Sequence, residues 1–203
     1  MLNFFILFLL FCAFAVLFYL CFNLCLQFFH PAICHTDGDV LYSFDDGPSI
    51  YTPQILEILK QHDQKAIFFC IGKNIATHPE IFAEILAHGH QVGNHSFSHS
   101  NFFGFKSLKD IIKEIQDTDD IMQKHGAVEV RYFRPPFGVI NPTISKALKR
   151  TGHTVMGWSV RSFDTILSKK IVLKRLKNIK KQDIILLHDS KSQTINILKQ
   201  LLK

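Results

Sequence analysis

The sequence predicts an α/β fold in which parallel β-strands alternate with crossover helices. Short apolar runs alternate with longer segments of helical periodicity over most of the chain, which is the pattern of repeated strand–helix units. The apolar runs have few polar interruptions, as expected for strands buried on both faces of a sheet. Polar motifs directly follow several of these runs, at the carboxyl ends of predicted strands, where active sites of such folds gather.

A continuous apolar segment precedes this alternating region. Residues 2–29 contain no charged side chain and are mainly Phe, Leu, Cys and Val. Because about 20 apolar residues suffice to cross the hydrocarbon core of a bilayer, we expect a transmembrane helix over residues 1–29. A cleaved signal peptide is the main alternative, but the segment has no basic start and no small-residue cleavage site. A buried core helix fits less well, because apolar side chains cover every face.

Residues 30–38 are expected to connect this segment to a single domain over residues 39–203. Six strands are predicted there, at residues 40–44, 66–71, 91–94, 131–133, 154–158 and 184–187. Six helices are predicted between and after them, at residues 52–62, 74–88, 107–125, 141–151, 168–179 and at the C-terminal end. Thr52 as an N-cap, Pro53 at the first helical position and Ser107 as a further N-cap support these assignments.

The basic residues concentrate in one predicted helix. The formal net charge is +6, and residues 169–181 hold the densest group of Lys and Arg. Val172, Leu173 and Leu176 recur there at helical spacing, so the solvated face of an amphipathic helix is the preferred interpretation. Attraction to an anionic polymer or to a membrane surface is the alternative. No aromatic residues are interleaved with the basic ones, so we expect no nucleic-acid partner.

The five cysteines show neither the spacing of a zinc site nor a disulfide framework. Cys12, Cys21 and Cys25 lie in the N-terminal apolar segment, Cys34 lies just beyond it, and Cys70 lies in a predicted strand. We expect all of them to act as small apolar side chains.

Two adjacent acidic residues, Asp45 and Asp46, follow the first predicted strand and precede Gly47-Pro48. Adjacent residues at the end of a strand point in different directions, so one carboxylate can bind a metal ion while its neighbour faces a substrate water. A plain Asp-Gly turn with solvated acids is the alternative.

A histidine pair, His95 and His99, follows the third predicted strand. On one helical turn, side chains four residues apart reach the same side, with Cβ atoms about 5–6 Å apart. Two histidines and an aspartate are a typical zinc donor set. Surface histidines also occur at this spacing, but the strand before the pair and the acidic motif at an earlier strand end favour a metal site.

An arginine and a late histidine end two further predicted strands. Arg134 is followed by two prolines, Phe137 and a glycine, and its guanidinium could hold a carboxylate or form an ordinary surface ion pair. His188 could be a satisfied core residue. Paired with Asp164, it could instead be a proton donor with a raised pKa.

Together these motifs resemble the polysaccharide deacetylases, the carbohydrate esterase family that includes chitin, peptidoglycan and acetylxylan deacetylases. The resemblance rests on residues 43–48, 95–99, 134–138, 158–164 and 186–188, in this order within about residues 39–200. It implies a distorted (β/α) barrel of six to seven parallel strands. It also implies a hydrolase that removes acetyl groups from N- or O-acetylated sugars of a cell-surface polysaccharide.

The resemblance assigns a metal site to three residues. Asp46, His95 and His99 look like ligands of a divalent ion, with zinc preferred and cobalt, manganese or nickel as alternatives. The implied reaction is attack of a metal-activated water on the acetyl carbonyl group.

It also assigns catalytic roles to five residues. Asp45 looks like the base, held by Arg134, and His188 looks like the acid, tuned by Asp164. The backbone N–H of Phe137 looks like part of the oxyanion hole.

The chain departs from the family pattern in two places. Arg161 stands where the family usually has an acid, and Thr165 stands where it usually has a tryptophan. The chain also ends at Lys203 without the strand that usually follows the last helix, so an incomplete barrel is expected.

Two other functions stay open. One is a catalytically inactive, membrane-anchored glycan-binding protein, and the other is a hydrolase of other non-peptide C–N bonds. The apolar segment favours a single-pass membrane protein with its catalytic domain in the periplasm or outside the cell, acting on a polymeric substrate.

Overall fold

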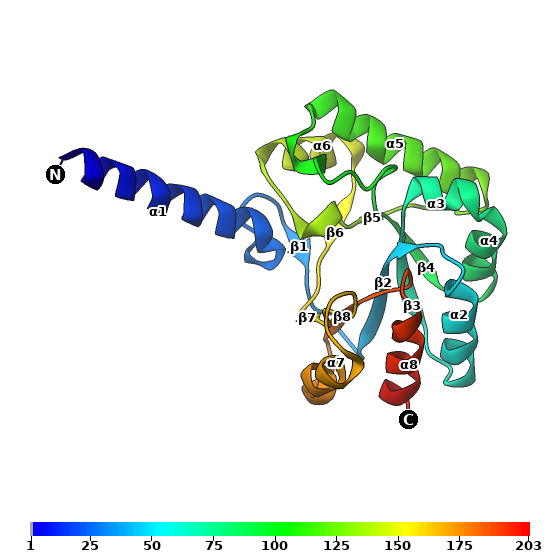
Figure 1. Cartoon of the computed structure of the whole chain (residues 1–203). Helices are drawn as coiled ribbons and strands as arrows, with labels where there is room; N and C mark the ends of the chain where they lie inside the picture. Colours follow the sequence, from blue (N-terminus) through cyan, green and yellow to red (C-terminus); the bar gives the residue numbers. More distant parts are fainter. Residues whose placement is uncertain (1) are drawn as a thin grey trace.

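The computed structural model describes residues 2–203 and contains a parallel sheet surrounded by helices (Figure 1). Its eight strands are β1 (Ala32–Ile33), β2 (Leu41–Gly47), β3 (Ala66–Cys70), β4 (Gln91–Asn94), β5 (Tyr132–Phe133), β6 (Thr154–Met156), β7 (Val160–Arg161) and β8 (Ile184–His188). The predicted parallel α/β fold is therefore confirmed. The predicted number of six to seven strands is too low, because β1 and β7 have two residues each and form no recognisable apolar run.

The order of the strands is β1-β6-β5-β4-β3-β2-β8-β7, and every neighbouring pair is parallel. β1 and β7 lie at the two edges, and no ladder joins them among the described residues. The sheet is therefore an open half-barrel rather than a closed barrel. β2 and β8 are adjacent, with Asp45 paired to His188 in register, so two predicted site residues lie side by side.

Helices connect and cover these strands. They are α1 (Leu2–Phe22), α2 (Thr52–Gln61), α3 (Gly72–Thr77), α4 (Pro79–Ala87), α5 (Leu108–Lys124), α6 (Pro142–Thr151), α7 (Lys169–Arg175) and α8 (Ser192–Leu201). Four short 3-10 turns are η1 (Leu24–Leu26), η2 (Phe103–Phe105), η3 (Pro136–Gly138) and η4 (Leu176–Asn178). The helix predicted over residues 74–88 is divided into α3 and α4 at His78, because Pro79 has no N–H to continue the first helix.

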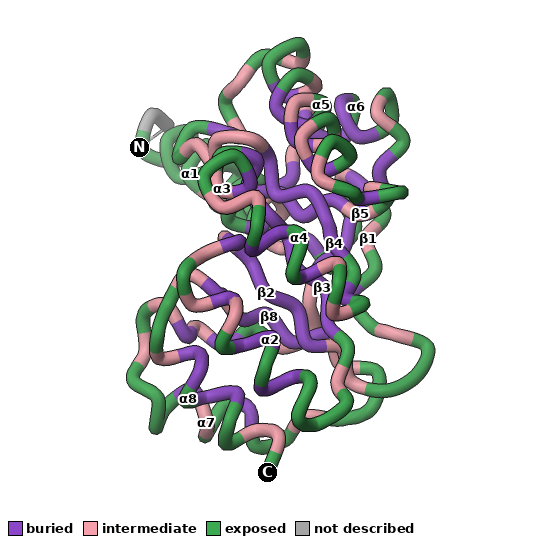
Figure 2. The backbone as a smooth tube through the Cα atoms, turned by 90° about the vertical axis from the view of Figure 1, so that its right-hand side faces the viewer, coloured by how far each residue is buried: buried purple, intermediate pink, exposed green. Residues whose placement is uncertain are grey.

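The core follows the sheet, and the exposed residues gather on the outer faces of the helices (Figure 2). All five residues of β3 are buried, and Phe68 on this strand stacks on Phe44 of β2 at 4.9 Å between ring centroids. Val172 and Leu176 are buried while the basic side chains around them are mostly exposed, which confirms the amphipathic interpretation of residues 169–181.

The N-terminal helix α1 projects from the body of the molecule (Figure 1). Most of its described side chains are apolar and exposed. Among the residues that the structure describes, no helix combines the length and the apolar character needed to cross a membrane. This finding corrects the prediction of a transmembrane helix over residues 1–29.

Residues that follow Phe22 turn back and pack against the half-barrel. Asn23 donates a side-chain hydrogen bond to the carbonyl of Tyr19, and the chain then turns through η1. Leu24 is 3% exposed and packs in the same apolar cluster as Phe133. The apolar stretch is therefore continuous in sequence but divided in space, with one part on α1 and the other in the core.

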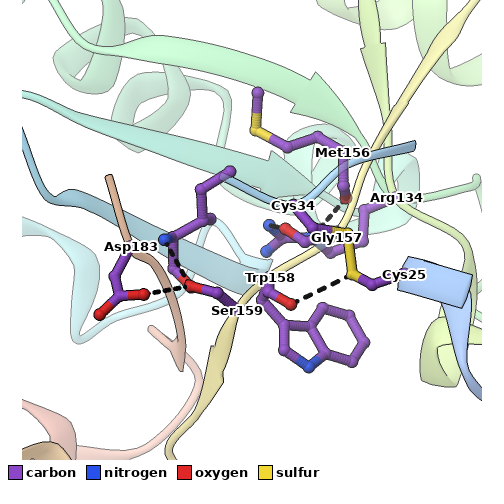
Figure 3. The surroundings of a disulfide bond; sticks show 9 residues. Cys25, Cys34, Arg134, Met156, Gly157, Trp158, Ser159 and Asp183 are labelled. Carbon is purple, nitrogen blue, oxygen red and sulfur yellow. Dashed lines mark hydrogen bonds between the residues drawn. A yellow bond between two sulfur atoms is a disulfide. The ribbon is translucent and has the colours of Figure 1, made fainter. Parts of the chain in front are cut away.

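A disulfide joins Cys25 and Cys34, which corrects the expectation that all the cysteines are apolar fillers. Figure 3 shows it beside Gly157 and Trp158, on the segment that follows β6. A Cβ atom added to Gly157 would meet both sulfur atoms within 3 Å, so the disulfide packs directly on this backbone. The same Gly157 carbonyl accepts a hydrogen bond from Arg134, which connects the disulfide region to the site described next.

Candidate active site

The carboxyl end of β2 points two carboxylates in different directions, as predicted. Asp45 faces the buried guanidinium of Arg134, whereas Asp46 faces the two histidines. Asp46 has a φ of 73°, in the left-handed region that few residues other than Gly adopt, and the β2–β3 register shifts between Asp45 and Gly47. This irregularity turns the second carboxylate away from the first.

The histidine pair lies on a loop rather than on the predicted helical turn. Ser96 and His99 have φ values of 64° and 47°, so the chain reverses tightly after β4 instead of continuing as a helix. The loop still brings the rings of His95 and His99 to 4.8 Å between centroids. The predicted proximity is therefore confirmed, while its predicted structural cause is wrong.

Two buried polar residues that the sequence motifs did not reveal hold this loop in place. Glu114 of α5 accepts hydrogen bonds from the backbone N–H groups of Phe97 and Ser98, at 3.1 and 2.8 Å. Asn94 accepts a hydrogen bond from the N–H of Ser96 at 2.8 Å. A glutamate on the buried side of an amphipathic helix was the signal available in the sequence, since acids at such positions are usually paired.

Hydrogen bonding determines the tautomer of His95. Its Nδ1 lies 2.7 Å from the carbonyl oxygen of Arg134, which can only accept, so Nδ1 carries the proton. The lone pair of Nε2 then faces Asp46 and is available to a cation, as in many protein metal sites. Nε2 lies 3.6 Å from Asp46 Oδ1, and His99 Nε2 lies 3.5 Å from the same oxygen.

Asp46, His95 and His99 thus form one cluster whose donor atoms all lie within 4.8 Å of one another. One carboxylate oxygen and two imidazole nitrogens fit a divalent metal ion, with further positions open to water or substrate. Burial lowers the pKa of His99 to about 4, so its imidazole is neutral at neutral pH. A neutral imidazole is the form that binds metals.

Arg134 is fully buried and is not the surface ion pair of the alternative interpretation. Its Nη1 donates to Asp45 Oδ1 at 2.6 Å and to Ser43 Oγ at 3.0 Å. Nε and Nη2 donate to the carbonyl oxygens of Met156 and Gly157. The guanidinium therefore fixes Asp45 and compensates its charge, while Asp45 Oδ2 stays 3.8 Å from His95 Nε2.

His188 and Asp164 form the predicted pair, with His188 Nδ1 at 2.8 Å from Asp164 Oδ1. Asp164 also accepts hydrogen bonds from the hydroxyls of Ser162 and Thr194 and from the N–H of His188. Burial disfavours the charged imidazolium, but the hydrogen bond and charge of Asp164 outweigh this and raise the pKa of His188. Asp164 thus engages Nδ1, and Nε2 is the ring nitrogen that it leaves free.

Phe137 lies beside His99 of the metal-type cluster. Its φ of 59° is left-handed, and its ring centroid lies 4.8 Å from that of His99. The structure therefore places this residue beside the metal-type cluster, and the use of its N–H as an oxyanion donor remains a prediction. Of the three phenylalanines after the histidine pair, Phe103 is buried in the core, whereas Phe102 and Phe105 are exposed.

A further buried acid, Asp189, lies under the turn that carries the acidic pair. It accepts a hydrogen bond from Thr52 Oγ1 at 2.5 Å, and its backbone N–H donates to the carbonyl of Asp45 at 3.2 Å. Burial and the charge of Asp46 raise the pKa of Asp189 to about 7. This residue follows His188 directly, but nothing in its spacing predicted that it would support β2.

Comparison with known proteins agrees with this arrangement. A profile of the polysaccharide deacetylase family matches residues 32–156. A peptidoglycan-N-acetylglucosamine deacetylase of Bacillus cereus is 34% identical over 171 residues, covering 80% of this chain and 79% of the relative. The chain spans 63% and 47% of two further deacetylases of the same name and organism.

Solved structures show the same fold. The peptidoglycan deacetylase PdaC of Bacillus subtilis matches with a TM-score of 0.75 and 31% identity, covering 82% of each chain. BA3943, a CE4 family pseudoenzyme of Bacillus anthracis, matches with a TM-score of 0.77 and 27% identity, covering 85% of this chain and 63% of that one.

The chain belongs to the polysaccharide deacetylase family. Its named relatives are deacetylases, and the protein is a hydrolase of this family. The pseudoenzyme match means that the fold alone does not separate active from inactive members, so the activity of this chain depends on its own site residues.

Proposed function

We propose that this protein removes acetyl groups from N-acetylated, or alternatively O-acetylated, sugars of a polysaccharide, with acetate and a deacetylated sugar as products. One observation carries the proposal. Asp45, its partner Arg134, the cluster of Asp46 with two histidines, and the His188–Asp164 pair are assembled at the ends of neighbouring strands. An inactive binding protein would not require this complete set of catalytic groups.

The Asp46, His95 and His99 cluster is proposed to hold a divalent ion, with zinc preferred. Cobalt, manganese or nickel would also suit one carboxylate and two imidazoles. Such an ion, when bound, lowers the pKa of a coordinated water and polarises a carbonyl group. The protonated Nδ1 of His95 orients its ring for this purpose through the carbonyl of Arg134.

Asp45 is proposed to act as the general base. Its Oδ1 is held by Arg134, while its Oδ2 lies on the side of the metal-type cluster. Arg134 fixes the orientation of the carboxylate, which leaves the other oxygen to accept the proton of the attacking water. The guanidinium makes further hydrogen bonds to backbone carbonyls, so it cannot follow the carboxylate if that group moves.

His188 is proposed to act as the general acid on the leaving sugar nitrogen or oxygen. Asp164 holds Nδ1, so the proton available for transfer is on Nε2. The N–H of Phe137 is proposed to donate to the oxyanion that forms when the carbonyl is attacked. The two groups would act on opposite ends of the bond that is cleaved.

We further propose that the domain works outside the cytoplasm, in the periplasm or outside the cell. The Cys25–Cys34 disulfide supports this location, since disulfides persist mainly in oxidising compartments. A large glycan substrate would also be met there.

The test is release of acetate by the full chain from chito-oligosaccharides, peptidoglycan fragments and acetylxylan, with added zinc and with chelator. We expect release on at least one substrate, its loss with chelator, and a fall of at least about 10²-fold for Asp45→Asn. Asp117→Asn is the matched control, because this aspartate pairs with Lys113 on the exposed face of α5.

The alternatives give different results. Absence of release from every glycan by a folded chain that binds zinc would support an inactive glycan-binding protein. Hydrolytic ring opening of small cyclic amides, without acetate from glycans, would support a hydrolase of other C–N bonds.

A further inference from the structure

Two guanidinium groups lie beside the catalytic residues without a role in the mechanism above. Arg161 is in β7, where it pairs with Leu186 of β8, two residues before His188. Arg175 of α7 donates a hydrogen bond to the backbone carbonyl of Arg161 at 3.2 Å. Both side chains belong to exposed residues, so both groups can be reached by a ligand.

The side chain of Trp158 lies between Arg161 and Arg134, the arginine that holds Asp45. The ring of Trp158 lies 5.6 Å from the guanidinium carbon of Arg134 and 5.6 Å from that of Arg161. Arg134 in turn holds Asp45. Arg161 therefore lies at the rim of the site.

Neither guanidinium forms an ion pair in the part of the chain that the structure describes. The nearest site acids are already engaged, Asp45 with Arg134 and Asp164 with His188. The side chain of Arg161 also donates no hydrogen bond to another described residue. Its N–H groups, which can bind a carboxylate or phosphate through two parallel hydrogen bonds, are thus free.

Aromatic rings hold the two groups in place. The guanidinium carbons of Arg161 and Arg175 each lie 4.7 Å from the ring centroid of Phe163. Stacking on a ring face orients a guanidinium while leaving its N–H edge available. Since two like charges against one ring repel each other within about a Debye length of 8–10 Å, an anion bound near both would relieve this repulsion.

We propose that Arg161, assisted by Arg175, binds an anionic group carried by the glycan substrate, a carboxylate or a phosphate ester, on a sugar close to the one that loses its acetyl group. This inference rests on the proposed function, because it places the anion on the same polymer. Arg161 stands where an acid is usual in the family pattern, so the charge at this rim is reversed relative to that pattern.

The first test measures binding by the full chain through the fluorescence of Trp158, the single tryptophan of the sequence. The probes are an oligosaccharide of alternating N-acetylglucosamine and its 3-O-lactyl ether, the same compound with its carboxyl groups converted to amides, and chitotetraose with and without a phosphate ester. Chelator prevents turnover. We expect the anionic probe of at least one pair to bind about tenfold more tightly than its neutral partner, with a preference that shrinks at high salt.

Substitutions then show which residues cause the preference for anionic over neutral probes. Arg161→Gln should bring the ratio of the two affinities close to one, Arg161→Lys should retain part of it, and Arg175→Gln should reduce it. Arg150→Gln, at the exposed end of α6, is the matched control and should leave the ratio unchanged. The ratio of the affinities for two probes does not change when part of the protein is unfolded, because both affinities are affected equally. Equal binding of charged and neutral probes, or a preference that survives Arg161→Gln, would overturn the proposal.

Acetate release from the same probes separates this inference from the proposed function. If anionic probes bind more tightly but no acetate is released from any of them, the anion site stands and the proposed function fails. If acetate is released with the same kcat/KM from charged and neutral forms, and the two forms bind equally, the function stands and the anion site fails.

Discussion

At the scale of single residues, several hydrogen-bond donors hold one buried acid of the site, Asp164. Asp164 is fully buried and accepts hydrogen bonds from two hydroxyls, one backbone N–H and the His188 ring. Such a carboxylate stays ionised, because hydrogen bonding to its charged form lowers its pKa against the effect of burial. Its negative charge is what keeps His188 protonated to higher pH.

This contact predicts the pH dependence of the reaction. An acid catalyst works only while protonated, so activity is lost as the pH rises through the pKa of His188, which lies above its ordinary value. In Asp164→Asn the charge that raises this pKa is removed, and the alkaline limb of the kcat/KM profile should move to lower pH by about 1–2 units. The profile of Asp117→Asn serves as the reference. An unchanged alkaline limb in Asp164→Asn would show that His188 is not the acid.

At the scale of elements, β2 is the strand that carries the two adjacent carboxylates of the site. It pairs with β3 on one side and β8 on the other, and Asp45 and Asp46 directly precede the turn at Gly47. Asp189, directly after β8, packs against this turn and hydrogen-bonds to Thr52 at the start of α2. Three elements therefore meet at a point with no room for an added side chain.

Gly47→Ala tests how closely these elements pack. The added Cβ would collide with the carboxylate of Asp189, so we expect a loss of about 1–3 kcal/mol in the free energy of unfolding. Gly38→Ala is the matched control, because nothing lies within 4 Å of the position of its added Cβ. Urea denaturation of the two variants beside the wild type gives the comparison. Equal stability of both variants would mean that the turn has more freedom than the structure shows.

At the scale of the whole molecule, the N-terminal segment is fastened to the half-barrel at one edge. β1 pairs with β6, Leu24 packs in the core, and the Cys25–Cys34 disulfide lies against Gly157. Gly157 also accepts the hydrogen bond of Arg134, so this edge supports the residue that holds Asp45, the proposed base. The covalent link therefore packs on Gly157, a residue that directly contacts Arg134 of the site.

Loss of the disulfide should destabilise the protein. The two cysteines are 9 residues apart in sequence. A disulfide that closes a loop of this size lowers the conformational entropy of the unfolded chain, which stabilises the folded state by about 2–3 kcal/mol. We expect Cys25→Ser with Cys34→Ser, or addition of a reductant, to lower the free energy of unfolding by this amount. Cys12→Ser, in α1, should have no comparable effect. If thermal and urea unfolding of the double variant match those of the wild type, the link is not a source of stability.

The sequence by itself determined the parallel α/β class, most strand and helix positions and the residues of the site, because these depend on local apolar periodicity and on short motifs at strand ends. Ser107 caps α5 and Asn141 caps α6 through side-chain hydrogen bonds that the local sequence is sufficient to specify. Two of the three two-residue strands, β1 and β7, were missed, since so short a segment carries no periodicity and is a strand only through its partner. Only the tertiary structure decided where the apolar N-terminal stretch divides and which cysteines pair. It also decided that Glu114 holds the histidine loop and that Asp189 supports the turn after the two carboxylates. Each of these depends on contacts between segments far apart in the chain, whose energies no local pattern records.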